Sequence, residues 1–328
     1  VASLFTGKAV TEHGVDWVTR GEETFVRALA DSHATVAEHY KEKGFQTVFI
    51  SANPLLSAET GLQRGFDHVV VASDASELRG EKLMGALEET LADLDSEQPL
   101  FLFFNPTDAL DPYPAIPTRT PFAEPQDRVK LDLETRDVSN PYYRFITGLS
   151  DAEAAGPWLE RVKAGYAFGV YRADAALGAM MRYLRDEAWF NRGYRVVITS
   201  DHGVHLGERG LVRHGVALNE EAVRVPFVYY DSTVDGQITL REPISTASAF
   251  ELLKTGAPPT EPLAVRSVMR PNPTRIAPGH EGAVQWNGKH KGVFIDGEFT
   301  RYNLKKDRDE EDPKPLEGFE LEEDLRAL

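Results

Sequence analysis

The sequence predicts an α/β fold in which a mixed, mostly parallel sheet is sandwiched by helices, followed by a small α+β subdomain. Two observations predict the main domain: apolar, β-rich runs alternate with longer helical segments, and the run over residues 100–104 is apolar on both faces. Such runs are typical of strands buried between two helix layers. The subdomain is predicted from Asn287-Gly288 and Asp296-Gly297, which are hairpin turn pairs. We therefore expect a main domain over residues 1–256 and a subdomain over 257–328.

In chain order we expect a helix over residues 22–43, a strand over 47–50, a helix over 81–94, a strand over 100–104, a helix over 155–186, and strands over 194–199 and 225–230. The first helix is predicted from Leu29, Val36 and Tyr40, which recur at helical spacing before Gly44, a natural helix end. The long helix keeps its apolar residues on one face, at spacings typical of an amphipathic helix.

Three other regions are predicted to lie outside the main elements. Residues 111–141 are rich in proline, threonine and charge, and we expect a long surface excursion there. Prolines also cluster near residues 257–259 and 271–273, where the main domain is expected to end. The tail over residues 307–328 holds ten acidic residues against three basic ones, which favours a solvated terminal loop and helix.

Composition narrows the classes of function. The 328 residues carry 52 acidic and 36 basic side chains and a net charge of −16, so phosphate backbones and anionic membrane surfaces are repelled. We expect neither nucleic-acid binding nor membrane insertion, while homo-oligomers remain open. Cysteine is absent, which excludes disulfides, zinc–thiolate sites and a cysteine nucleophile within these residues. The chain shows no signal peptide, so we leave the compartment open: cytoplasmic, or periplasmic or secreted if the natural N-terminus carries a signal.

The densest group of chemically useful residues follows the expected strand over 194–199. Asp201 and His202 place a carboxylate and an imidazole on one turn closed by Gly203, with His205 and His214 shortly after. Ligand sites in α/β proteins lie after such strands, and these two side-chain types bind divalent ions. From residue chemistry alone, a metal site and an ordinary hydrogen-bonded loop stay equal alternatives.

The surroundings of this turn resemble a known family. The stretches over residues 200–211, 214–215, 219–221 and 224–226 closely resemble the metal-and-anion loop of the sulfatases, which belong to the alkaline-phosphatase superfamily. Further segments resemble that family in the same order along the chain: residues 2–7, 13–15, 44–47, 51–54, 61–67, 108, 111–113 and 302–304. The resemblance therefore covers nearly the whole chain and implies an alkaline-phosphatase/sulfatase-like fold.

The resemblance also implies roles for individual residues. Asp201 and His202 would be metal ligands, with Ca²⁺ or Mn²⁺ as the expected ion and Mg²⁺ or Zn²⁺ as alternatives. His214 would be catalytic and would contact the sulfate or phosphate group of a small-molecule ester. Asn105 and Asp108 fall at substrate-binding positions of the family.

Several positions depart from the family pattern. The nucleophile motif, C/S-x-P-S-R, and the paired aspartates of the first strand would lie upstream of Val1, which takes the place of the motif's arginine. Asn105 and Leu110 replace histidines. Three functions stay open: a sulfatase whose nucleophile and remaining metal ligands precede this chain, a phosphodiesterase or phosphonate hydrolase of the same superfamily, and an inactive binding or assembly protein. We expect residues 1–328 alone to be inactive.

Overall fold

The computed structural model describes residues 1–20, 23–74, 77–114, 116, 139–149, 151, 153–236, 243–258, 266–269, 282–287, 289–295 and 297–315. The chain forms two compact units, which are described separately. The first unit comprises Val1–Val36, Gly193–His205 and Arg213–Leu328, and the second comprises Ala37–Arg192 and Leu206–Val212. The division into residues 1–256 and 257–328 stays a prediction.

A three-stranded parallel sheet is the centre of the second unit. Strand β3 (Gln46–Ser51) lies between β4 (His68–Val71) and β5 (Leu100–Asn105), and Val48 is opposite Leu102 of β5. All of β3 after Gln46 is buried, because helices or aromatic side chains cover both faces. The expected strands over residues 47–50 and 100–104 are confirmed.

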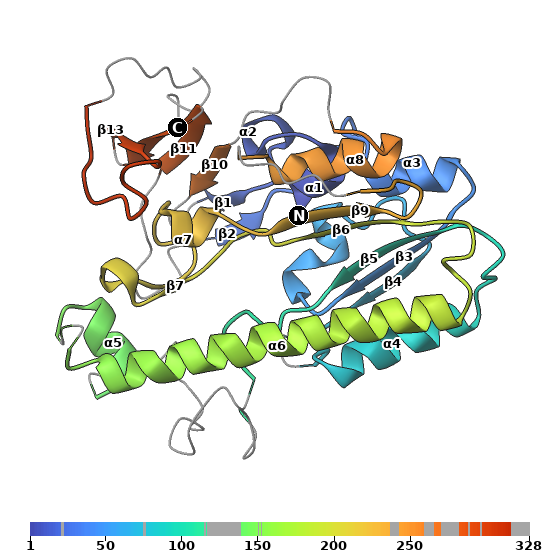
Figure 1. Cartoon of the computed structure of the whole chain (residues 1–328), viewed down its shortest axis with the longest axis horizontal. Helices are drawn as coiled ribbons and strands as arrows, with labels where there is room; N and C mark the ends of the chain where they lie inside the picture. Colours follow the sequence, from blue (N-terminus) through green and yellow to red (C-terminus); the bar gives the residue numbers. More distant parts are fainter. Residues whose placement is uncertain are drawn as a thin grey trace. The chain divides into compact units, whose positions relative to one another are not determined.

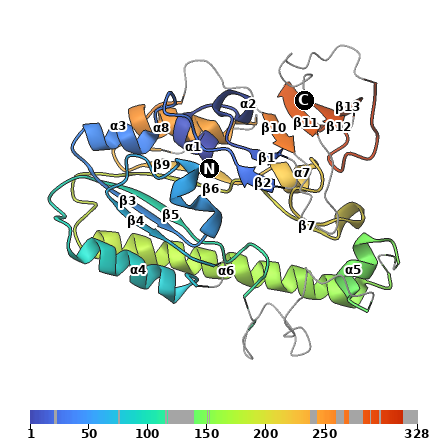
Figure 2. The ribbon, with the colours of Figure 1, turned by 180° about the vertical axis from the view of Figure 1, so that it is seen from behind.

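Two helices, α4 (Glu81–Ala92) and α6 (Gly156–Asp186), lie side by side along one face of this sheet (Figures 1 and 2). Their buried residues form a common core with the strands; it includes Val48, Ile50, Leu83, Leu87, Leu91, Met180 and Leu184. With 31 residues, α6 is about 46 Å long. Both expected helices are confirmed, and they end within two residues of the predicted limits. Among the described residues, no helix is long and apolar enough to cross a membrane.

Aromatic rings pack at the other face of the sheet. Phe49 of β3 lies 4.8 Å from Phe103 and 5.1 Å from Phe66, measured between ring centroids. Tyr40 of α3 (Val36–Glu42) stacks on Phe101 at 4.8 Å. The β-rich runs therefore bury apolar side chains on both faces, as the sequence predicts.

The expected helix over residues 22–43 is wrong in its first half. Strands β1 (Trp17–Arg20) and β2 (Glu23–Val26) form an antiparallel hairpin, and helical structure begins only at Val36. Valine, threonine and aromatic residues dominate these two short runs, and such residues pack well across a strand pair. Cross-strand pairing therefore overrides a helical spacing of only a few residues.

In the first unit, β6 (Arg195–Thr199) pairs antiparallel with β9 (Phe227–Asp231). The second of these strands begins two residues later than predicted, directly after Pro226, which has no backbone N–H for the ladder. Helix α8 (Ala249–Thr255) contacts both β6 and α1 (Ala2–Thr6). Other short elements along the chain are α2 (Val10–His13), α7 (Glu220–Val223), β7 (His205–Leu206) and β8 (Val212–Arg213), together with α5 (Pro141–Ile146) in the second unit.

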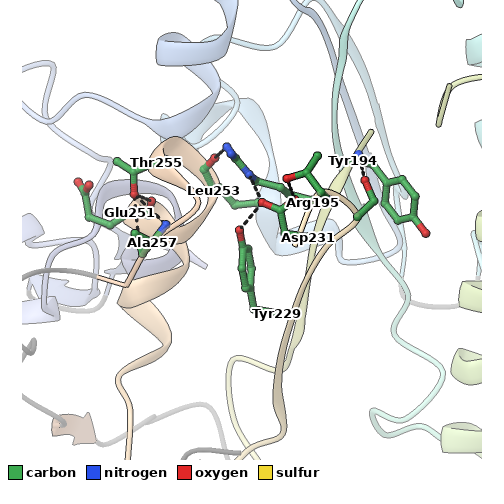
Figure 3. A network of polar contacts seen from close by, with 10 residues as sticks. Tyr194, Arg195, Tyr229, Asp231, Glu251, Leu253, Thr255 and Ala257 are labelled. Carbon is green, nitrogen blue, oxygen red and sulfur yellow. Dashed lines mark hydrogen bonds and ion pairs between the residues drawn. The ribbon is translucent and has the colours of Figure 1, made fainter. Parts of the chain in front are cut away.

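A polar network fixes the end of the β6–β9 ribbon where Arg195 faces Asp231 (Figure 3). Arg195 Nε donates to Asp231 Oδ2 at 2.8 Å, and its Nη1 donates to the Leu253 carbonyl of α8 at 3.4 Å. The hydroxyls of Tyr229 and Thr233 also donate to the Asp231 carboxylate, at 3.2 and 2.6 Å. The network therefore joins the ribbon to the carboxyl end of α8, where a cation is favoured.

The C-terminal sheet is an antiparallel meander in the order β10 (Arg266–Met269), β11 (Gly282–Asn287), β12 (His290–Ile295) and β13 (Glu298–Asn303). Both expected hairpins are confirmed, because Asn287 is opposite His290 and Ile295 is opposite Glu298. Leu218, Val284 and Val293 form the core of this region. Three of the predicted regions lie partly or wholly outside the described residues. They are much of the excursion over 111–141, residues 271–273 and the end of the acidic tail. The expectation of a solvated tail is wrong at Glu310, which is buried.

Candidate functional site

The candidate site is a tight turn directly after β6. The Ser200 hydroxyl donates to the His202 carbonyl at 2.8 Å, and the Gly203 N–H donates to the Ala222 carbonyl of α7 at 2.7 Å. A Cβ atom at Gly203 would lie 2.1 Å from the carbonyl oxygen of Glu221. Only glycine therefore lets the turn lie this close to α7.

The hydrogen bond of His202 determines which ring nitrogen is available. Its Nδ1 lies 2.9 Å from the Gly203 carbonyl oxygen, which can only accept, so Nδ1 carries the proton in the neutral ring. The lone pair is then on Nε2, which lies 3.8 Å from Asp201 Oδ1. Two ligands bound to one divalent ion at about 2.0–2.4 Å lie about 3–4 Å apart, so both atoms fit a shared ion.

The Asp201 side chain is partly exposed, at 44%. Burial of its oxygens acts to raise the pKa of this carboxyl, but the neighbouring His202 ring and the N–H groups of Asp201 and His202 lower it below its usual range. The carboxylate is therefore ionised at neutral pH, as a metal ligand must be.

His214 returns to this turn after the intervening loop. The rings of His202 and His214 stack in parallel, with centroids 4.1 Å apart and an angle of 15° between their planes. The structure thus brings together the two histidines that the sequence analysis placed in one site. Their roles as ligand and catalytic residue stay predictions.

His205 has a different environment. It lies in β7 and has no exposed surface. A fully buried imidazole has no direct access to a solvent-borne anion, so its surroundings favour a role within the protein interior.

Asn105 and Asp108 belong to the second unit. The Asn105 amide donates to Ser51 Oγ at 3.1 Å. Asn105 is the last residue of β5, and Ser51 is the last residue of the neighbouring parallel strand β3. Asp108 is completely buried; its Oδ1 accepts from Arg172 Nε at 2.6 Å and its Oδ2 from the Gly80 N–H at 3.3 Å. Both roles in substrate binding stay predictions, and the contacts of Asp108 are those of a structural ion pair.

Sequence reasoning missed Arg213, which directly precedes His214. This arginine has a left-handed backbone with φ of 75°. Such a conformation is uncommon for a residue with a side chain and concentrates at functional sites. The sequence alone carries no signal for this backbone.

The residues of the turn fit a divalent ion but do not complete its coordination. Among the described residues, no group of three or more histidine, aspartate or glutamate side chains could hold a metal. Asp201 and His202 offer one oxygen and one nitrogen, a donor pair that suits Mn²⁺ or Zn²⁺ and supplies the oxygen that Ca²⁺ and Mg²⁺ prefer. Further ligands are needed for tight binding.

Comparison with known proteins identifies the family of the chain. Residues 1–255 match the family model named Sulfatase. Among proteins with curated descriptions, none matches the chain in sequence.

Solved structures show the same fold. BT4656, solved in complex with D-glucosamine-2-N,6-O-disulfate, is 15% identical with a TM-score of 0.68; the match covers 97% of this chain and 83% of that one. BT1596, a 2-O GAG sulfatase, is 17% identical with a TM-score of 0.65, covering 97% and 76%. The phosphonate monoester hydrolase of Agrobacterium radiobacter is 15% identical with a TM-score of 0.64, covering 97% and 81%.

Proposed function

Because the chain belongs to the sulfatase family, we propose that it forms most of a divalent-metal-dependent hydrolase of small-molecule sulfate esters. Asp201 and His202 would hold the ion, with Ca²⁺ or Mn²⁺ expected. The nucleophile and the remaining metal ligands would be supplied by residues upstream of Val1.

The observation that carries this proposal is the orientation of the turn after β6. His202 Nδ1 is engaged by Gly203, which leaves Nε2 facing Asp201 Oδ1 at 3.8 Å. This hydrogen bond sets the tautomer and leaves Nε2 as the nitrogen that could bind an ion, in the way that a carbonyl behind the ring orients a metal-binding histidine.

When bound, the ion would supply positive charge that polarises the ester and stabilises the charge that develops on its oxygens. This chain's residues have narrower tasks. Asp201 and His202 would position the ion. His214, whose ring stacks on that of His202, would contact the anionic group of the substrate.

A second candidate is hydrolysis of phosphonate monoesters or phosphodiesters. The phosphonate monoester hydrolase matches this fold with a TM-score of 0.64, close to the 0.65 of BT1596. Sulfate and phosphonate groups are both tetrahedral anions, so Asp201, His202 and His214 would serve either substrate.

The test compares this chain with the same chain preceded by its native upstream sequence. Each is assayed with an aryl sulfate, an aryl phosphodiester and an aryl phosphonate in the presence of Mn²⁺ or Ca²⁺. We expect metal-dependent hydrolysis by the extended protein only, with the aryl sulfate preferred. Asp201→Ala should abolish it, whereas the matched control Asp186→Ala, an exposed residue of α6, should not.

Three outcomes would contradict the proposal. Turnover by residues 1–328 alone that depends on Asp201 would mean that the nucleophile lies within this chain. Preference for the phosphorus substrates would favour the second candidate. Metal binding without any turnover by the extended protein would favour the inactive binding or assembly protein, for which Asn105, Leu110 and Val1 already depart from the family pattern.

A further inference from the structure

A buried charge cluster lies in the first unit, apart from the residues assigned to metal and substrate. Lys291 of β12 has no exposed surface, and its Nζ lies 2.6 Å from Glu310 Oε1 and 3.1 Å from Glu220 Oε1. The same ammonium lies 5.2 Å from the centre of the Trp286 ring. Buried charges of this kind need partners, because removal from water is unfavourable.

Glu310 connects this cluster to the start of α7. Its Oε2 accepts from the Asn219 amide and from the Glu220 N–H, each at 3.1 Å. Glu310 also has a left-handed backbone, with φ of 51°, which is costly for a residue with a side chain. The fold therefore tolerates strain at the residue that joins Lys291 to α7.

Helix α7 in turn supports the metal turn. Its Ala222 carbonyl accepts from the Gly203 N–H at 2.7 Å, and a Cβ at Gly203 would lie 2.1 Å from the Glu221 carbonyl oxygen. The Gly203 carbonyl accepts a hydrogen bond from the His202 Nδ1–H, with 2.9 Å between the nitrogen and the oxygen. A continuous series of contacts thus runs from the Lys291–Glu310–Glu220 cluster through α7 to the ring that offers Nε2.

We propose that Lys291 and Glu310 are positioning residues, which hold α7 so that Gly203 keeps His202 in the Nδ1-protonated form with Nε2 available. The inference rests on the proposed function for its importance, since the metal is what Nε2 would bind. The cluster is not needed simply to fill space, because apolar residues of similar size often replace buried ion pairs without loss of stability. Partners behind a metal ligand typically change metal affinity 10–100-fold when they are removed.

The first experiment uses the ¹⁵N shifts of the histidine rings, which report which ring nitrogen carries the proton. His202→Gln assigns the signal among the nine histidines. In the unsubstituted chain we expect His202 to be protonated at Nδ1. In Lys291→Met we expect a mixture with the Nε2-protonated form. The matched control is Lys163→Met, which removes an exposed lysine that pairs with Glu160 on the surface of α6, and should leave the signal unchanged.

Lys291→Met leaves two glutamates without their cation, so it can fail to fold. Glu220→Gln is the milder second variant, because Lys291 keeps Glu310 while its direct link to α7 is weakened. In the protein with its native upstream sequence, we expect either folded variant to bind Mn²⁺ about tenfold more weakly than the unsubstituted protein.

Folded Lys291→Met or Glu220→Gln with an unchanged His202 signal and unchanged Mn²⁺ affinity would overturn the inference. The ring-nitrogen measurement requires neither metal nor substrate, so it separates the two proposals. A shifted His202 signal in a protein without metal-dependent turnover would support the positioning role and reject the proposed function. A protein with metal-dependent turnover whose His202 signal is unchanged by both substitutions would support the proposed function and reject the positioning role.

Discussion

The two ends of the β6–β9 ribbon each carry an aspartate, and the two aspartates have opposite surroundings. Asp231 accepts from Arg195, Tyr229 and Thr233, and its side chain is only 4% exposed (Figure 3). Asp201 follows the other end; its side chain is 44% exposed and faces His202 Nε2. The Asp231 carboxylate is therefore engaged in contacts that stabilise the fold, whereas the Asp201 carboxylate has oxygen available for a ligand.

This difference shows that residue type and position after a strand do not by themselves identify a site. The partners within hydrogen-bond distance decide it. A carboxylate already bonded to a guanidinium and two hydroxyls stabilises a structure, and one beside an oriented imidazole can bind an ion. The following predictions test that distinction, from the largest expected effect to the smallest.

The largest effect should be on metal binding. In the protein with its native upstream sequence, Asp201→Asn should weaken Mn²⁺ binding by at least about 100-fold, because it removes the charged oxygen beside His202 Nε2. Asp231→Asn should leave the affinity within about twofold. Isothermal titration calorimetry measures both, and equal losses in the two variants would remove the distinction between the two ends.

The second prediction concerns Asp108, an aspartate after a strand in the second unit. Asp108→Asn should lower the free energy of unfolding by about 2–3 kcal/mol, since Arg172 loses its buried partner but is itself 32% exposed. Urea unfolding measures this loss. A double-substitution cycle with Arg172→Gln should show that the two effects are not additive. Unchanged stability together with a raised KM for the ester would instead identify Asp108 as a substrate-binding residue.

The third prediction compares the same substitution at two glycines. Gly203→Ala should lower the free energy of unfolding by about 1–3 kcal/mol and weaken Mn²⁺ binding, because the new methyl group would overlap the Glu221 carbonyl and displace the turn. Gly85→Ala in α4 has open space and should raise stability by about 0.5–1 kcal/mol without effect on the metal. Normal metal affinity in Gly203→Ala would show that the turn tolerates displacement.

Much of the fold could be predicted from the sequence, for physical reasons that differ between elements. The strand β5 and the helix α6 carry long, strong patterns of burial, and both are confirmed. The β1–β2 hairpin could not be predicted, because four-residue strands offer too few positions to separate an alternating pattern from a helical one.

The candidate site was predictable where its residues are close in the sequence. The approach of His214 to the Asp201-His202 turn was expected from the resemblance of this short loop to the sulfatases. The ion pair between the buried Asp108 and Arg172 was not predictable, since the two residues are separated by 64 positions in the sequence. The same holds for the contact between Lys291 and Glu310, because nothing local in a sequence indicates which distant charges will meet in the interior.

The smallest effect should be on the stability of the protein at acidic pH. It concerns the end of the β6–β9 ribbon where Asp231 is held by its hydrogen bonds. The hydrogen bonds from Thr233 and the ion pair with Arg195 hold the pKa of Asp231 well below its usual range. An aspartate with a lowered pKa in the folded state stabilises the protein above its unfolded pKa of about 3.9, and this contribution is lost as the pH falls toward the folded value. The chain should therefore lose stability below about pH 4 more steeply than Asp231→Asn, which has no carboxyl to titrate there. Thermal unfolding measured from pH 6 to pH 2.5 compares the two. Parallel curves for both proteins would mean that Asp231 does not titrate differently on folding, and that this end of the ribbon is no more committed to the fold than the end that carries Asp201.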